Sequence, residues 1–400
     1  MNPFAKLLSA ENASYLSDAA SKLSSGDGEP APTPKQVQQM LGICLAASLE
    51  RDEGRDTTFT MCFARPTDGT NGFILRTPLP ANSNALRRLG AAVDLHRGFV
   101  CVMPSANDGL DIVGIKVMRG HRELKQGHGV TMALCIRVFG AGVLTVSHGM
   151  MPLLVHRGEH TQIIKEPHQA ELWSPTRLPP VQLPDPVRVY GVVGRYLAES
   201  MVHIGHGGTL LAIPDEVDWE NELGDAQSLF KGGPVPCTLV RDALLDASQQ
   251  ERDKFNRMPP KVHAAVNAGD RAAQVLGRQL YTSTDNAVEG CLDWLAQLTA
   301  TDGMTIVRSD LTVLAFGVII QARSDGENPR IMRQGLLDAT PTDIRLEDLG
   351  GGRHQSAARA CIRLKGAVAY VASQDGGLTT MRWDEKENAL VVMRDLELLL

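Results

Sequence analysis

The sequence predicts a mixed α/β fold, of the α+β kind, arranged in two domains. A chain of 400 residues exceeds what one ordinary hydrophobic core accommodates, so we expect more than one domain. Short β-branched runs alternate with segments whose apolar residues recur at helical spacing. Residues 174–186 contain five prolines, which disfavour helix and sheet interiors and therefore indicate a boundary.

Four segments follow from this boundary. Residues 1–35 end in a Ser/Gly/Pro-rich run, so we expect a flexible N-terminal segment. Residues 36–173 are expected to form a sheet-rich N-terminal domain, and 174–186 a Pro-rich linker. Residues 187–400 are expected to form a second α/β domain, with a mixed sheet and flanking helices.

The composition narrows the class of protein. The chain is 43% hydrophobic with a net charge of −6, and aromatic residues make up 4%. Binding to DNA or RNA needs surplus cations and base-stacking aromatics, so neither is expected as a partner. No apolar run reaches about 18 residues and no signal-peptide pattern is present, so we expect a cytoplasmic protein without a membrane partner. Seven cysteines without a CxxC pair are typical of reduced, buried thiols.

Periodicity predicts the elements of the N-terminal domain. Helices are expected at about 34–53, 83–97 and 130–139. Strands are expected twice within 57–78, around a turn, and at 98–103, 110–117, 142–147 and 153–164.

The same reasoning covers the C-terminal domain. Helices are expected at 189–204, 236–245, 287–299 and 353–364, with helical tendency over 247–275. Strands are expected at 209–214, 304–309, 312–322, 366–373 and in a last hairpin over 378–392, whereas 323–349 is expected to be a long polar loop.

Two pairs of segments resemble each other within the chain. Residues 127–146 parallel 352–371, with a shared Cys-Ile-Arg and a following Gly-Ala turn, and 102–117 resemble 305–320. This pattern indicates a degenerate duplicated module, while coincidence between two α/β segments stays open as the alternative.

The residues that suggest chemistry lie in the second domain. Gly350-Gly351-Gly352-Arg353-His354 precedes the expected helix, so free backbone N–H groups and an arginine fork could face an anion. Asp302-Gly303 stands at the mouth of a strand, where a carboxylate can point into a cleft. Ser373 ends another strand. The structural alternatives are a helix cap in a flexible loop for the glycine run, and plain turns for the other two.

Taken together, these motifs resemble the diadenylate cyclase family. Asp302-Gly303, then Gly-Gly-Arg-His-Gln-Ser-Ala-Ala, then Val-Ala-Ser-Gln-Asp-Gly are similar to that family's Asp-Gly-Ala, Gly-Thr-Arg-His-Arg and Ser-Gln or Ser-Glu turn, in the same order. The similarity covers about residues 190–383. The whole chain, with its sheet-rich first half, resembles the DACNV group of diadenylate-cyclase-like proteins, regarded as probable sensor domains.

The resemblance implies roles for individual residues. Asp302 would be the catalytic, metal-facing carboxylate if the protein is active, holding Mg²⁺ or Mn²⁺ on ATP phosphates; a metal is expected only with a bound nucleoside triphosphate. Arg353 and His354 would contact phosphate, and Ser373 would line the site. The remaining motif positions expected at the nucleotide are Gly303, Met304, Gly351, Gly352 and Gln355. A homo-oligomer is implied, since two sites of this family face each other across a dimer.

Three departures from the family pattern bear on activity. Met304 stands where the family has Ala, Gly352 where it has Thr, and Gln355 where it has a second Arg. Loss of a cation that meets developing phosphate charge weakens catalysis more than binding. The sequence therefore favours a nucleotide-binding sensor for ATP or a cyclic (di)nucleotide. The alternatives are an active metal-dependent diadenylate cyclase, which makes cyclic di-AMP from two ATP, and a structural module; whether the protein is an enzyme stays open.

One motif is set aside. His156-Arg157-Gly158-Glu159-His160 has the H-x-x-E-H spacing of a zinc protease, which requires a helix. The surrounding residues alternate like a strand with a turn at Gly158, so a zinc site is not expected here.

Overall fold

The chain folds into two compact units in the computed structural model. Met1–Gln169 form the N-terminal unit and Ala170–Leu398 the C-terminal unit. The structure describes residues 4–23, 31–52, 54–66, 72–90, 93, 95, 98–117, 133–149, 151–164, 190–224, 227–231, 236–256, 285–320, 329–338 and 340–399. The expected Pro-rich linker, 174–186, lies outside them. The mixed α/β class predicted from the sequence is confirmed.

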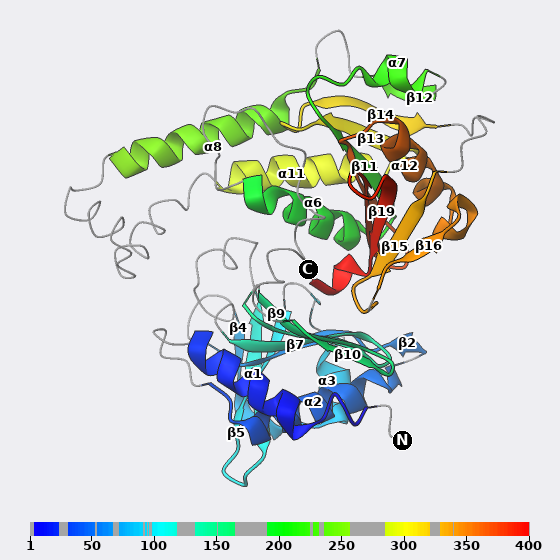
Figure 1. Ribbon diagram of the computed structural model, residues 1–400. Coiled ribbons are helices and arrows are strands. Elements are labelled where there is room, and N and C mark those ends of the chain that lie inside the picture. Colours follow the sequence, from blue (N-terminus) through cyan, green and yellow to red (C-terminus); the bar gives the residue numbers. More distant parts are fainter. Residues whose placement is uncertain are drawn as a thin grey trace. The chain divides into compact units, whose positions relative to one another are not determined.

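The N-terminal unit is built on a mixed sheet with the strand order β10-β9-β8-β7-β3-β5-β6-β4 (Figure 1). Strands β3 and β5 are parallel, and all other neighbouring pairs in this order are antiparallel. The strands are β3 (Phe59–Phe63), β4 (Gly72–Pro80), β5 (Gly98–Pro104), β6 (Leu110–Val117), β7 (Leu134–Gly140), β8 (Val143–His148), β9 (Met151–Arg157) and β10 (His160–Ile163). A separate short pair joins β1 (Arg51–Asp52) to β2 (Arg55–Asp56).

Helices cover one face of this sheet: α1 (Ala10–Leu23), α2 (Pro34–Ser48) and α3 (Ser83–Gly90). Helix α2 begins at a capping box, in which Thr33 and Gln36 bond each other's backbone N–H. Residues of β3 alternate between the two faces, because side chains along a strand point to opposite sides. Phe59 and Met61 pack with the helices, whereas Cys62 packs in a second cluster that contains Cys101 and Cys135.

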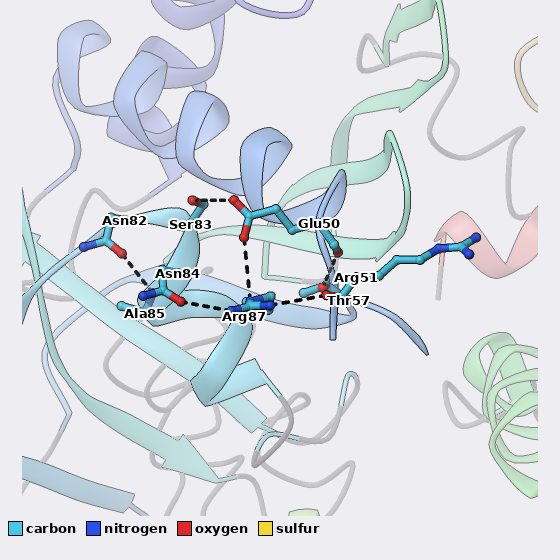
Figure 2. A network of polar contacts seen from close by, with 8 residues as sticks. All are labelled: Glu50, Arg51, Thr57, Asn82, Ser83, Asn84, Ala85 and Arg87. Atoms are coloured by element: carbon cyan, nitrogen blue, oxygen red, sulfur yellow. Dashed lines mark hydrogen bonds and ion pairs between the residues drawn. The ribbon is translucent and has the colours of Figure 1, made fainter. Parts of the chain in front are cut away.

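A polar network ties the end of α2 to α3 (Figure 2). The Glu50 carboxylate accepts a hydrogen bond from Ser83 Oγ at 2.9 Å and lies 3.7 Å from Arg87 Nε. Arg87 in turn donates to the Arg51 carbonyl at 3.3 Å, and Thr57 Oγ1 donates to the Glu50 carbonyl at 2.7 Å. These contacts fix the chain as it leaves α2 and approaches β3.

Strand β4 forms an edge of this sheet and is exposed along nearly its whole length. Phe73 is 69% exposed, Ile74 55% and Leu79 43%. Among the described strands β4 pairs with β6 alone, so its outer row of backbone groups faces away from the sheet.

The C-terminal unit is built on a second mixed sheet, in the order β12-β14-β13-β11-β17-β18-β19-β15-β16 (Figure 1). Two neighbouring pairs, β11 with β13 and β15 with β19, are parallel. The strands are β11 (Gly208–Ile213), β12 (Gln227–Lys231), β13 (Met304–Arg308), β14 (Val313–Ile319), β15 (Ile331–Gly335), β16 (Thr342–Ile344), β17 (Val368–Ala372), β18 (Leu378–Asp384) and β19 (Ala389–Arg394).

Helices lie on both faces of this sheet (Figure 1). One face carries α6 (Tyr190–Ile204) and α11 (Asp285–Thr299), with α8 (Leu239–Asn256) against α11. The other carries α12 (Gly352–Arg363) and α7 (Trp219–Leu223), whose buried side chains pack on Leu211, Met304 and Val371. Short 3₁₀ turns η3 (Leu346–Leu349) and η4 (Leu396–Leu399) complete the unit. The small side chains of Ala357 and Ala358 let α12 approach the strands closely.

Two sequence expectations are wrong. The helix expected at 130–139 is strand β7 from Leu134 onward, because its residues pair with β3 on one side and β8 on the other. The loop expected at 323–349 contains β15, β16 and η3, since β15 pairs with β19. The turn at 67–69 and the segment 257–275 lie outside the described residues.

Candidate functional site

The sheet topology brings three chain segments to one edge. Parallel strands β11 and β13 begin side by side, with Leu210 opposite Thr305. Strand β17 runs antiparallel to β11 and ends at the same edge, where Ala372 pairs with Gly208. The segments Gly207-Gly208, Asp302-Gly303 and Ser373-Gln374 therefore lie at this edge, which we call the site edge.

Arg353 reaches the site edge from the first turn of α12. A Cβ added to Gly207 would lie 2.7 Å from Arg353 Nη1, 3.2 Å from the Ala372 carbonyl oxygen and 3.3 Å from Gln374 Cγ. The absence of a side chain at Gly207, whose φ is +69°, thus makes room for the guanidinium. Within the described residues, Arg353 Nε is buried and has no hydrogen-bond partner. A buried donor in this state is costly unless another group satisfies it.

His354 follows Arg353 and lies in a mixed-charge environment. A Cβ on Gly350 would lie 3.7 Å from His354 Nδ1 and 3.8 Å from Arg394 Nη2, so these side chains converge on that glycine. Burial, and then the Arg394 cation, lower the pKa of His354 below its ordinary value of 6.5, while Asp375 opposes them. Arg394 is held in turn by a hydrogen bond to the Leu349 carbonyl.

The N-terminus of α12 adds backbone donors to the site edge. Gly351 at the N-cap provides no side-chain cap, and the first turn has no acidic residue. The first N–H groups of a helix have no partner within the helix, and its dipole favours an anion there. Within the described chain, Ser356 Oγ on the same helix is also buried without a partner. The helix end thus presents donors without an acceptor of its own.

Asp302 and Gly303 form the neighbouring part of the site edge. Gly303 has φ +96°, and a Cβ there would lie 2.6 Å from the carbonyl carbon of Gly317 on β14. This close backbone packing requires glycine. Asp302 is exposed, and its Oδ1 accepts a hydrogen bond from the Gly303 N–H at 3.2 Å.

The other expected site residues differ in position. Gly351 and Gly352 are exposed, with open space where a Cβ would be. Gln355 is engaged locally, since its Nε2 donates to the Gly350 carbonyl at 3.1 Å. Ser373 begins the turn between β17 and β18, where its N–H donates to Gly377 at 2.8 Å. Met304 is 1% exposed and belongs to the core.

Three residues at the site edge were not identified as candidates from the sequence. Gly207 and Gln374 flank the Arg353 guanidinium, and Arg394 lies beside His354. The pair Gly207-Gly208 at the start of β11 was a local signal for Gly207. No local signal marks Arg394, which comes 40 positions after His354 and reaches it through β19.

A metal would need the help of a ligand at this edge. No group of three His, Cys, Asp or Glu side chains that could hold a metal occurs among the described residues. A single exposed carboxylate, Asp302, fits the way Mg²⁺ is held, by one or two carboxylates together with phosphate oxygens.

Comparison with known proteins gives one match. Residues 27–117 match the family model described as "Probable sensor domain DACNV". The match supports the similarity to the DACNV group and indicates a sensor domain in the N-terminal unit; it covers under a quarter of the chain and none of the site edge. No curated protein and no solved structure matches the chain. Among the described helices, none has the length and apolar character needed to cross a membrane.

Proposed function

We propose that the site edge of the C-terminal unit binds the phosphate groups of ATP or of a cyclic dinucleotide, and that the chain is a nucleotide-binding sensor. The observation that carries this proposal is Arg353, whose Nε is buried without a hydrogen-bond partner in the described chain. An oxyanion is the acceptor that best satisfies a guanidinium, because it accepts two parallel hydrogen bonds from it.

The neighbouring groups support the same ligand chemistry. The uncapped start of α12 offers backbone N–H groups, and His354 and Arg394 stand on the same side of that turn. In this proposal Arg353 binds one phosphate, the helix end and His354 bind the next oxygens, and Gly207 leaves room for the guanidinium. Diadenylate-cyclase-like ancestry of this unit is part of the proposal and rests on the motif resemblance.

A second candidate function is the metal-dependent synthesis of cyclic di-AMP. Asp302 favours it, because its exposed carboxylate lies just before β13, and β13 is the neighbour of the strand that Gly207 precedes. With ATP bound, Mg²⁺ or Mn²⁺ would supply charge neutralisation on the phosphates. Gln355 stands where the family pattern has a second arginine, and its side chain bonds the Gly350 carbonyl and Arg359, which favours binding without turnover.

Calorimetric titration of the full chain with ATP, and separately with cyclic di-AMP, tests the binding function. We expect saturable binding of one of them, weakened about 10-fold to 100-fold by Arg353→Ala, because a charge-assisted hydrogen bond contributes roughly 1.5–3 kcal/mol. Arg359→Ala is the matched control: it lies on the same helix, half-buried, and contacts Gln355 at 3.5 Å. Equal loss in both variants, or no binding at submillimolar nucleotide, would contradict the proposal.

A product assay separates the two candidates. Full-length protein is incubated with ATP and Mn²⁺, and the products are chromatographed. Under the sensor proposal no cyclic di-AMP forms. Formation of cyclic di-AMP by the wild type, and its loss in the Asp302→Asn variant, would establish cyclase activity instead.

A further inference from the structure

The two units share one strand arrangement. The order β4-β6-β5-β3-β7-β8-β9 in the N-terminal unit corresponds to β12-β14-β13-β11-β17-β18-β19 in the C-terminal unit. In both, the two central strands are parallel and all other neighbouring pairs of the seven are antiparallel. The order along the chain agrees as well. Edge strand β4 falls between the parallel strands β3 and β5, and edge strand β12 falls between the parallel strands β11 and β13. A helix precedes each of these four parallel strands.

Residues also correspond in one hairpin. The resemblance of 102–117 to 305–320 aligns β5-β6 with β13-β14, and it places Gly114 on Gly317. Both hairpins contain a shift in register, next to Cys101 in the first and between Met304 and Val307 in the second. By contrast, the sequence alignment of 127–146 with 352–371 sets strand β7 against helix α12, so it does not follow the correspondence of the two folds.

The faces of the sheets correspond as well. In the N-terminal unit Cys62 pairs with Cys135 on β7 and with Cys101 on β5. We match Cys62 with Thr209 of the C-terminal unit, which pairs with Val371 on β17 and comes one residue before the pair of Leu210 with Thr305 on β13. This match places Cys101 on Met304 and Cys135 on Val371. Both cysteines pack on the face opposite α2, and both counterparts pack on the face covered by α12.

We infer that the chain contains two copies of one fold, and that, among the residues that the structure describes, only the C-terminal copy has an end open to a ligand; the second part rests on the proposed function. In the C-terminal copy the pairing of β11 with β17 stops at Gly208 and Ala372. In the N-terminal copy the equivalent pair is Met61 with Ile136, and the strands continue through the pairs Thr60 with Arg137 and Phe59 with Val138.

Strand residues therefore occupy the place of the site edge in the N-terminal copy. The hairpin alignment puts Phe99, 4% exposed, where Asp302 stands, and Val100 where Gly303 stands. Thr60 replaces Gly207, and its hydroxyl donates to the Leu95 carbonyl at 2.7 Å. In the described part of the chain this strand end is paired, and Phe59, Thr60 and Phe99 are buried there, so one site per chain is expected.

A crystal structure of the full chain, soaked with inorganic pyrophosphate, tests both parts. We expect the seven strands of one unit to superpose on those of the other in the same order, with pyrophosphate at Arg353 and none at Thr60 and Phe99. A different strand order would overturn the duplication, whatever binds. Pyrophosphate at the N-terminal end, or at neither end, would overturn the second part.

Titration with nucleotide separates this inference from the proposed function. One site per chain, lost in Arg353→Ala and kept in Arg359→Ala, is the expected result. Two sites per chain, one of them surviving Arg353→Ala, would refute the closed N-terminal end. Failure of every nucleotide to bind would count against the proposed function, while the superposition still decides the duplication.

Discussion

Arg353 Nη1 lies where a side chain on Gly207 would begin, 2.7 Å from the position of its Cβ. The two residues are far apart in sequence and come from different elements, the start of α12 and the turn before β11. The site edge therefore depends on a glycine that contributes space rather than a contact.

Replacing Gly207 should disable this arrangement. Gly207→Ala is expected to displace the Arg353 guanidinium and to weaken nucleotide binding at least 10-fold in calorimetry. The control is Gly205→Ala, which has nearly the same φ, +70° against +69°, but whose Cβ would be 4.0 Å from its nearest neighbour. Both variants should lose about 1 kcal/mol of stability from the left-handed backbone. Equal binding by both would mean that Arg353 is not the anion contact.

Gly303 should be essential for folding of the C-terminal unit. In Gly303→Ala the new Cβ would meet the backbone of Gly317 at 2.6 Å and of Val318 at 2.8 Å, and backbone cannot move aside cheaply. We expect a loss of about 3 kcal/mol or more in urea unfolding. Gly290→Ala in α11, with open space at the Cβ, should instead stabilise by up to about 1 kcal/mol. Similar stability in the two variants would show that the backbone at Gly303 does not pack as closely on Gly317 and Val318 as these distances require.

Nucleotide affinity should rise as the pH falls. Burial and Arg394 lower the pKa of His354, so the free imidazole is neutral at pH 7 and gains a proton only below its ordinary value of 6.5. A bound phosphate favours the protonated form and so raises this pKa; binding therefore strengthens as the pH falls through the pKa of the bound state and levels off below that of the free state. The difference between wild type and His354→Gln, titrated at pH 7.5 and 5.5, removes the contribution of the phosphate's own ionisation. Identical pH dependence in the two proteins would exclude His354 from the site.

The network around Arg87 should stabilise the N-terminal unit. Arg87→Ala removes hydrogen bonds to Asn84 and the Arg51 carbonyl, together with the ion pair to Glu50. We expect a loss of about 1–2 kcal/mol, because this side chain is partly screened from water. Lys35→Ala, which removes an exposed pair with Asp108, should change stability by less than about 0.5 kcal/mol. Thermal denaturation that ranks Lys35→Ala as the more damaging variant would contradict this.

Much of the C-terminal fold is predictable from local pattern. The hairpin β13-β14, helix α12 and strand β17 all fall close to their expected positions, because glycines and turn residues separate clear periodic runs. The start of β7 misleads, since Ala133 and Leu134 are good helix formers. Pairing with β3 and β8 outweighs that preference, as tertiary context often does.

The site edge is predictable in part. Arg353 and His354 follow a glycine run at a helix start, which is a local signal for an anion site. Their companions are set by the order of strands: β19 brings Arg394 to His354, and the end of β17 brings Gln374 to Gly207. Strand order depends on contacts between distant segments, and no pattern within a single window records it.

The exposed edge strand β4 has a practical consequence. Phe73 and Ile74 are exposed beside backbone groups that pair with no described strand, and such features lead sheets of separate molecules to join edge to edge. Arg76 is the single charge within the strand, and one charge gives little colloidal protection. Preparations of this protein should therefore lose solubility first through β4, and Ile74→Lys, which adds a second charge to the strand, is the simplest way to keep concentrated samples dispersed.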